Sequence, residues 1–241
     1  MTVSDRKTPS TEAMFTKIAE RYDRCNHWFS LGIDRLWRKR LARAVDAAAG
    51  DAALDICCGT GDMAFALLKY SAARAVIGAD CSERMIQLAQ EKRMRLAVRR
   101  WMTDKTLRLH VADAAAMPFE DGAFDVVTCA FGLRNIPDRA AVLRQVSRVL
   151  KPGGRLGVCE FSLPKNPTLR AVYGVYLSRV MPLLGRLVLG DGDALRYLAR
   201  SILDWDATVR LEAELTQTGF VDVCATPLTG GIVTLTVGRK A

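Results

Sequence analysis

The feature that most constrains this chain is the regular alternation of short apolar runs with segments of helical length. Five runs are apolar at nearly every position, and a helix fits between each pair: 52–57, 75–79, 107–111, 124–130 and 155–161. Strands buried on both faces and joined by helices are typical of a mostly parallel sheet covered on both sides. The sequence therefore predicts a doubly wound α/β fold.

The two ends of the chain extend this core. After a polar tail over residues 1–10, Met14, Phe15, Ile18 and Tyr22 recur at helical spacing and a basic amphipathic stretch follows at 36–41, so we expect N-terminal helices within 11–50. Near the other end, residues 220–227 and 232–237 predict an antiparallel hairpin that brings the sheet to seven strands. With 241 residues, we expect a single domain over 11–241.

Composition excludes several classes of protein. Seven cysteines form no CxxC pair and only two histidines are present, which indicates reduced thiols in the cytoplasm and no metal site. The first residues lack a basic segment followed by an apolar one, and no apolar run reaches the length of a membrane span. We therefore expect neither secretion nor a transmembrane helix.

The net charge of +9 is unevenly distributed. Residues 84–108 carry eight basic side chains against Glu91 and Asp104. Such a segment is a solvated helix and loop, or it attracts a polyanion, either a nucleic acid or the anionic face of a membrane. Charge alone does not decide between these interpretations.

The most specific local pattern is a glycine turn after the first strand-like run. Residues 54–62 (LDICCGTGD) pass from a buried strand through Gly59, Thr60 and Gly61 into a helix. Glycines at these positions permit a tight turn and let a ligand approach the backbone. With Ala64 they also satisfy the relaxed dinucleotide pattern, so a nicotinamide enzyme stays among the alternatives.

Carboxylates at three successive strand ends favour another cofactor. Asp55 and Asp80 lie in or at the end of the first two strands, and Asp113 follows the third. Asp80 is placed to accept hydrogen bonds from ribose hydroxyls, and Asp113 from an adenine amino group. Acidic groups without a basic residue in the glycine loop suit a cationic sulfonium better than a pyrophosphate. We therefore expect S-adenosyl-L-methionine.

Motifs along residues 14–241 carry a resemblance to a known family. They are FTKIAERYDRCN (15–26), SLGIDRLWR (30–38), CGTGD (58–62), FGLRN (131–135), LKPGG (150–154), EFS (160–162) and LTGGIV (228–233). In these motifs the chain strongly resembles the ubiquinone/menaquinone biosynthesis C-methyltransferases, which are class I S-adenosylmethionine-dependent methyltransferases with a Rossmann-like fold. LKPGG is widespread among methyltransferases, whereas FGLRN and the N-terminal blocks are highly specific.

The resemblance implies a set of ligand contacts. Thr60, Asp80, Asp113 and Ala114 fall on the family's cofactor-contacting positions, and Ala130 stands where the family often has serine, so its contact would come from the backbone. Tyr22 and Asp23 belong to the N-terminal block that would close over the cofactor and substrate. Tyr22 is equally compatible with a core position.

The implied reaction methylates a ring carbon, which becomes nucleophilic when the neighbouring hydroxyl ionises. A phenol with a pKa near 10 is ionised to only about one part in a thousand at pH 7, a deficit of roughly 4 kcal/mol. Arg134 could stabilise the oxyanion and Asn135 could orient it. His27 is the candidate proton acceptor, with a water held by Arg134 or Asp23 as the alternative.

An apolar insert follows the fifth strand. Residues 169–189 are apolar but interrupted by arginines and by Gly174, Pro182 and Gly185, which should break or bend a helix. We expect residues 163–205 to form a helical lid over a greasy substrate path lined by Tyr197, touching the membrane interface, with ordinary buried core as the alternative.

The combined hypothesis is a C-methyltransferase that acts on a polyprenyl quinol, converting demethylmenaquinol to menaquinol. The alternatives are a methoxy-benzoquinol substrate in ubiquinone biosynthesis and a methyltransferase that binds nucleic acid. Only Trp101 interleaves an aromatic ring with the basic segment, which disfavours nucleic acid. We expect a cytoplasmic protein with peripheral contact to the inner face of an anionic membrane, and the sequence leaves the oligomeric state open.

Overall fold

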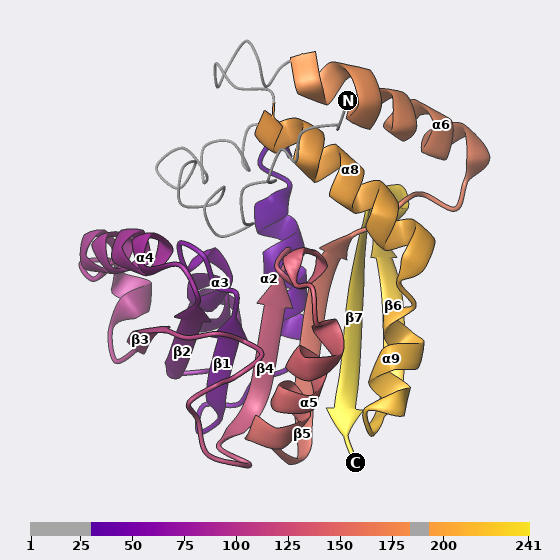
Figure 1. The fold of residues 1–241 in the computed structure, drawn as a ribbon. Helices are drawn as coiled ribbons and strands as arrows, with labels where there is room; N and C mark the ends of the chain where they lie inside the picture. Colours follow the sequence, from indigo (N-terminus) through magenta and orange to yellow (C-terminus); the bar gives the residue numbers. More distant parts are fainter. Residues whose placement is uncertain (1–29, 184–192) are drawn as a thin grey trace, which may run out of the picture.

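A seven-stranded sheet with the order β3-β2-β1-β4-β5-β7-β6 organises the protein (Figure 1). The structure is a computed structural model that describes residues 30–183 and 193–241. The strands are β1 (Ala52–Ile56), β2 (Ala75–Asp80), β3 (Thr106–Val111), β4 (Phe124–Ala130), β5 (Leu150–Phe161), β6 (Phe220–Leu228) and β7 (Val233–Lys240). The first five pair in parallel, and β7 pairs antiparallel with both β5 and β6. The predicted fold class and C-terminal hairpin are confirmed.

The strand order reverses at β1, which lies between β2 and β4. The chain runs outward from β1 through β2 to β3 and then returns to the other side of β1 with β4. Crevices of α/β sheets open at the carboxyl ends of strands at such a switch point. The glycine turn that follows β1 is therefore placed where a ligand is expected.

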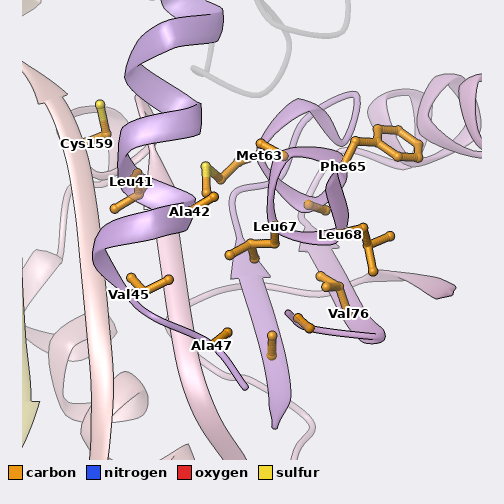
Figure 2. Close-up of a cluster of buried hydrophobic side chains, with 14 of the residues drawn as sticks. Leu41, Ala42, Val45, Ala47, Met63, Phe65, Leu67, Leu68, Val76 and Cys159 are labelled. Atoms are coloured by element: carbon orange, nitrogen blue, oxygen red, sulfur yellow. The ribbon is translucent and has the colours of Figure 1, made fainter. Parts of the chain in front are cut away.

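Helices α2 (Asp34–Ala44) and α3 (Asp62–Tyr70) cover one face of the sheet, and α5 (Arg139–Val149) and α9 (Leu211–Gln217) cover the other. Figure 2 shows the first of these layers, with Leu41 of α2 and Val45, which follows the helix, lying over the strands and Leu67 of α3 beside them. Gly157 of β5 makes this contact possible, because a Cβ there would overlap with the side chains of Leu41 and Val45. The α2 helix contains the basic amphipathic stretch at 36–41 that was identified in the sequence.

The predicted boundary before β5 is wrong by several residues. The sequence predicted the fifth strand over 155–161, but α5 ends at Val149 and β5 begins at Leu150. Leu150 pairs with Phe124, whereas Arg155 pairs with Val126, so a bulge absorbs the intervening residues. Gly153, at φ 77°, supplies the left-handed residue within that bulge.

The insert after β5 contains α6 (Pro167–Val175), a π-helical segment η3 (Tyr176–Val180) and, past residues outside the described range, α8 (Asp193–Thr208). Gly174 does not break the helix, contrary to expectation, because a single glycine costs a helix only about 1 kcal/mol. Pro182 does disturb it. Since Pro182 has no amide hydrogen, the carbonyl of Ser178 loses its usual helical partner, and the π segment lies just before this point.

A search for membrane spans within the described residues finds no helix both long and apolar enough to cross a bilayer.

Candidate active site

The glycine turn after β1 is built from left-handed backbone. Gly59 has φ 54° and Gly61, at the N-terminus of α3, has φ 85°. Cys57 has φ 51° although it carries a side chain, and Phe131, which follows β4, has φ 62°. Positive φ at non-glycine residues is strained and often occurs at functional sites. Both strained residues contribute to the same cavity wall.

That cavity has a volume of about 300 Å³ and lies at the carboxyl edge of the sheet. Its lining comes from the ends of four neighbouring strands and is mostly apolar: Cys57, Gly59, Asp80, Cys81, Ser82, Met85, Ala112, Asp113, Ala114, Ala130, Phe131, Gly132, Asn135, Ile136 and Pro137. The volume is at the lower end of the range for small-molecule sites. Among the predicted cofactor-contacting residues, the cavity therefore brings together Gly59, Asp80, Asp113, Ala114 and Ala130.

Asp80 connects the glycine turn to the second strand. Its Oδ2 accepts a hydrogen bond of 2.8 Å from the Gly59 amide, and its Oδ1 accepts one of 2.9 Å from the Ser82 amide. A carboxylate has about four lone-pair positions, so it can accept further bonds from a ligand. Asp80 is thus fixed by the fold and still able to bind a pair of hydroxyls.

Asp113 lies two residues beyond β3. Its Oδ1 accepts a hydrogen bond of 2.8 Å from the Ala115 amide, which orients the side chain while leaving it exposed. Together with Asp80, it gives the cavity wall two carboxylates. A cavity with this lining is suited to a ligand that carries hydrogen-bond donors and positive charge.

Asp55 is fully buried in β1 and does not line the cavity. Its Oδ1 accepts a hydrogen bond of 2.8 Å from the Thr128 hydroxyl, whereas no described residue bonds to its Oδ2. Burial raises the pKa of Asp55 to about 7. A buried acceptor with one atom unpaired, two residues before the cavity-lining Cys57, matches a ligand that brings a cationic donor.

Thr60 is buried and outside the cavity lining, and its hydroxyl accepts a hydrogen bond of 3.0 Å from Lys92 Nζ. The same amine donates to Asp62 Oδ1 at 2.7 Å. Helix α4 (Glu83–Leu96) thus places a cation beside the glycine turn, where Asp62 balances its charge. The sequence analysis missed this contact because thirty residues separate Lys92 from Asp62.

Other cations of the basic segment also bond within the chain. Arg93 donates to the Leu107 carbonyl at 2.9 Å, and Lys105 donates to the Leu68 carbonyl. These contacts account for part of the charge excess at 84–108 as internal hydrogen bonding.

Arg134 and Asn135 are neighbours in the short helix η2 (Leu133–Asn135), but their side chains have different partners. Asn135 lines the cavity, and its Nδ2 donates to the Phe131 carbonyl at 3.3 Å. The Arg134 side chain is only 4% exposed, does not line the cavity and forms an ion pair with Glu160. The structure therefore does not place the Arg134 guanidinium at the cavity wall, where the predicted oxyanion contact would require it.

Two residues of α8 are bonded to η2. The Tyr197 hydroxyl donates to Asn135 Oδ1 at 3.1 Å, and Arg134 Nε donates to the Ser201 hydroxyl at 2.9 Å. Tyr197 and Ser201 are one helical turn apart, so adjacent residues of η2 bind adjacent turns of α8. Tyr197 was predicted to line the substrate path, but it is not among the residues that line the cavity and contacts the site through Asn135. The contacts of Ser201 and Glu160 were not predicted, although Glu160 belongs to the EFS motif.

Tyr22, Asp23 and His27 lie outside the described residues. Within the described ranges, no three His, Cys, Asp or Glu side chains come together in a group that could hold a metal ion.

Comparison with known proteins gives a consistent result. The model of the ubiE/COQ5 methyltransferase family matches residues 1–240. A protein from Clavibacter sepedonicus named "Demethylmenaquinone methyltransferase" is 40% identical over 235 residues, 98% of this chain and 92% of that protein. One of the same name from Lactobacillus johnsonii is 37% identical over 228 residues, covering 94% and 91%.

A solved structure supports the fold. The crystal structure of a SAM-dependent methyltransferase from Aquifex aeolicus superposes with a TM-score of 0.56 at 17% identity, covering 85% of this chain and 89% of that one. This degree of sequence identity is evidence for the architecture alone.

Proposed function

The chain belongs to the ubiE/COQ5 methyltransferase family, and from this premise we propose that it methylates a ring carbon of demethylmenaquinol to give menaquinol. The methyl donor is S-adenosyl-L-methionine, whose sulfonium supplies an electrophilic methyl group when bound. The observation that carries the proposal is a cavity at the carboxyl edge of the sheet with Asp80 and Asp113 in its wall.

Three carboxylates would hold the donor. Asp80 would accept hydrogen bonds from both ribose hydroxyls, since its oxygens keep lone pairs after binding the Gly59 and Ser82 amides. Asp113 would accept from the adenine amino group. The unpaired Oδ2 of Asp55 would attract the ammonium of the methionine portion, through water or after a local rearrangement.

The quinol would lie on the side of the cavity formed by Asn135. Its amide is the polar group of η2 that faces the cavity, and Tyr197 holds it from the lid. We assign to Asn135 the contact with the ring hydroxyl that must ionise. His27, Tyr22 and Asp23 remain proposals for the proton acceptor and the closing lid.

Arg134 would act as a positioning residue. Its guanidinium is buried against Glu160 and Ser201, so a direct contact with the quinol oxygen would require this ion pair to open. Breaking a buried pair leaves an uncompensated charge, which costs about 3 to 5 kcal/mol. An intact ion pair that holds η2 to β5, together with the Ser201 bond that holds η2 to α8, explains the buried arginine without that cost.

The substrate also defines where the reaction takes place. A polyprenyl quinol is dissolved in the bilayer, so we expect the enzyme to collect it at the membrane surface. We propose that the protein contacts an anionic membrane peripherally and that residues 163–205 form the lid over the site.

The decisive experiment is incubation of the protein with methyl-labelled S-adenosylmethionine and chemically reduced demethylmenaquinone, followed by mass spectrometric location of the label. We expect the label on the ring carbon. Reduced demethylated methoxy-benzoquinone serves as the second substrate, and Asp80→Asn as the variant that fails to bind the donor. Label on oxygen, or no transfer to either quinol by protein that binds the donor, would refute the proposal.

A further inference from the structure

Helix α6 and η3 are apolar on two opposite sides. On the inner side, Tyr173, Leu177 and Met181 are buried against α8, where Leu195, Ala199 and Ile202 receive them. On the other side, four aliphatic side chains are between 40% and 62% exposed: Val172, Val175, Val180 and Leu183. We call these four residues the outer face of α6–η3. A helix that needed only to pack on its own protein would carry polar residues there.

The charged side chains within the segment that carries the outer face are all basic. Residues 163–183 contain Lys165, Arg170 and Arg179 but no aspartate or glutamate. Arg170 pairs with Asp206 at 3.0 Å, whereas Lys165 and Arg179 are exposed and form no ion pair with any residue in the described ranges. Two cations without an ion-pair partner among the described residues therefore accompany an exposed aliphatic surface.

The combination of exposed aliphatic and basic side chains indicates which kind of partner can cover the outer face of α6–η3. In a symmetric dimer through the outer face, the same patch would meet its own copy, and the unpaired Lys165 and Arg179 would add like charges to the interface. An anionic bilayer offers both complements, because its phosphates attract the cations and its acyl region accepts the aliphatic side chains. Charge complementarity thus selects a lipid surface.

The position of the outer face relative to the cavity adds a functional reason. Figure 1 shows α6 as the outermost element beyond the carboxyl edge of the sheet, with α8 beneath it. The same α8 that packs against α6 donates the Tyr197 bond to Asn135 at the cavity wall. Helix α8 therefore lies between α6 and the proposed quinol site.

We propose that the outer face of α6–η3 is the membrane-docking surface. Val172, Val175, Val180 and Leu183 enter the interfacial region of an anionic bilayer, while Lys165 and Arg179 contact lipid phosphates. This inference rests on the proposed function for its purpose, because docking at this face delivers a membrane-dissolved quinol directly to the lid.

The test is flotation of the full-length protein with vesicles of phosphatidylcholine alone or mixed with phosphatidylglycerol. The Val172→Asp/Val175→Asp variant should lose at least about tenfold in partitioning to the mixed vesicles. Arg179→Glu should lose binding to mixed vesicles and leave the weak binding to neutral vesicles unchanged. The matched control is Met94→Asp/Val98→Asp, which replaces two apolar residues elsewhere that are more exposed than Val172 and Val175, and it should bind as the wild type does.

Activity assays separate this inference from the proposed function. A short-tailed, water-soluble quinol should be methylated by the Val172→Asp/Val175→Asp variant at the wild-type rate, while a long-tailed quinol in vesicles should be methylated more slowly. Failure of the wild type to methylate the short-tailed quinol would count against the proposed function alone. Undiminished vesicle binding by the variant would overturn the docking surface. The proposed docking surface would also be overturned if the wild type were a dimer and the Val172→Asp/Val175→Asp variant were a monomer.

Discussion

The Tyr197 hydroxyl is hydrogen-bonded to Asn135 Oδ1 across 3.1 Å, which joins the lid helix α8 to a residue of the cavity wall. Asn135 is also bonded to the Phe131 carbonyl, so its amide is held from both sides. A side chain fixed in this way loses little conformational entropy when a substrate binds. Helix α8 therefore contributes to the geometry of the cavity wall.

Replacing Tyr197 with phenylalanine removes this bond and keeps the ring. We expect turnover with the quinol to fall by roughly twofold to tenfold, the equivalent of one hydrogen bond, while the affinity for S-adenosylhomocysteine stays unchanged. Steady-state kinetics and calorimetric titration measure the two effects. Tyr70→Phe, on the far end of α3, is the control, and equal losses in both variants would remove the assigned role.

Variants of the buried ion pair between Arg134 and Glu160 can distinguish its effect on the stability of the protein from its effect on the positioning of η2. Arg134→Ala should destabilise the protein by about 3 to 5 kcal/mol because Glu160 is left unpaired. The double variant Arg134→Met/Glu160→Met should recover most of that loss in urea unfolding and still methylate the quinol slowly. Normal turnover by the folded double variant would show that neither residue positions the site.

The contribution of Asp55 to the free energy of unfolding should decrease as the pH rises, whereas that of a carboxylate with a lowered pKa would increase. Its pKa is raised by burial from 3.8 to about 7, so the native state binds this proton more tightly than the unfolded chain does. The contribution of Asp55 to stability is therefore largest below about pH 4 and is lost as the pH rises to about 7. In Asp55→Asn, urea unfolding between pH 5 and pH 8 should show a flatter pH dependence. An unchanged slope would mean that Asp55 stays ionised.

Gly132 should tolerate no side chain. A Cβ there would overlap with Cys57 Cβ and lie 3.2 Å from the sulfur atoms of Cys57 and Cys129. Gly132→Ala should lower stability by about 1 to 3 kcal/mol, as overpacking does, and should distort the cavity wall. Gly174→Ala is the matched control, since nothing lies within 4 Å of its Cβ position and alanine favours the helix. Equal melting temperatures for the two variants would contradict the packing of the turn.

The sheet and the carboxylate of Asp80 in the cavity wall could be predicted from the sequence, because both depend on local patterns. Strands apolar on both faces form a recognisable pattern, and an acidic residue at the end of such a strand must lie at the carboxyl edge of the sheet, as Asp80 does. The position of Asp80 was therefore predictable without knowledge of the tertiary structure.

The orientation of Arg134 and Asn135, where we propose that the quinol binds, depends on contacts that no local sequence pattern encodes. Whether Arg134 or Asn135 faces the cavity is decided by the left-handed backbone at Phe131 and by Glu160, which is 26 residues away. Ser201 of α8 is farther still from Arg134 in the sequence. The same reason explains Lys92, whose bond to Thr60 requires α4 to pack beside the glycine turn.

The central claim is that the cavity after β1 holds the methyl donor with its ribose on Asp80 and the acceptor opposite, beside Asn135. A crystal structure of the protein with S-adenosylhomocysteine tests this most directly. We expect density for the nucleoside over Gly59, with both ribose hydroxyls within hydrogen-bond distance of the Asp80 carboxylate. A nucleoside bound elsewhere, or one whose ribose does not touch Asp80, would contradict it.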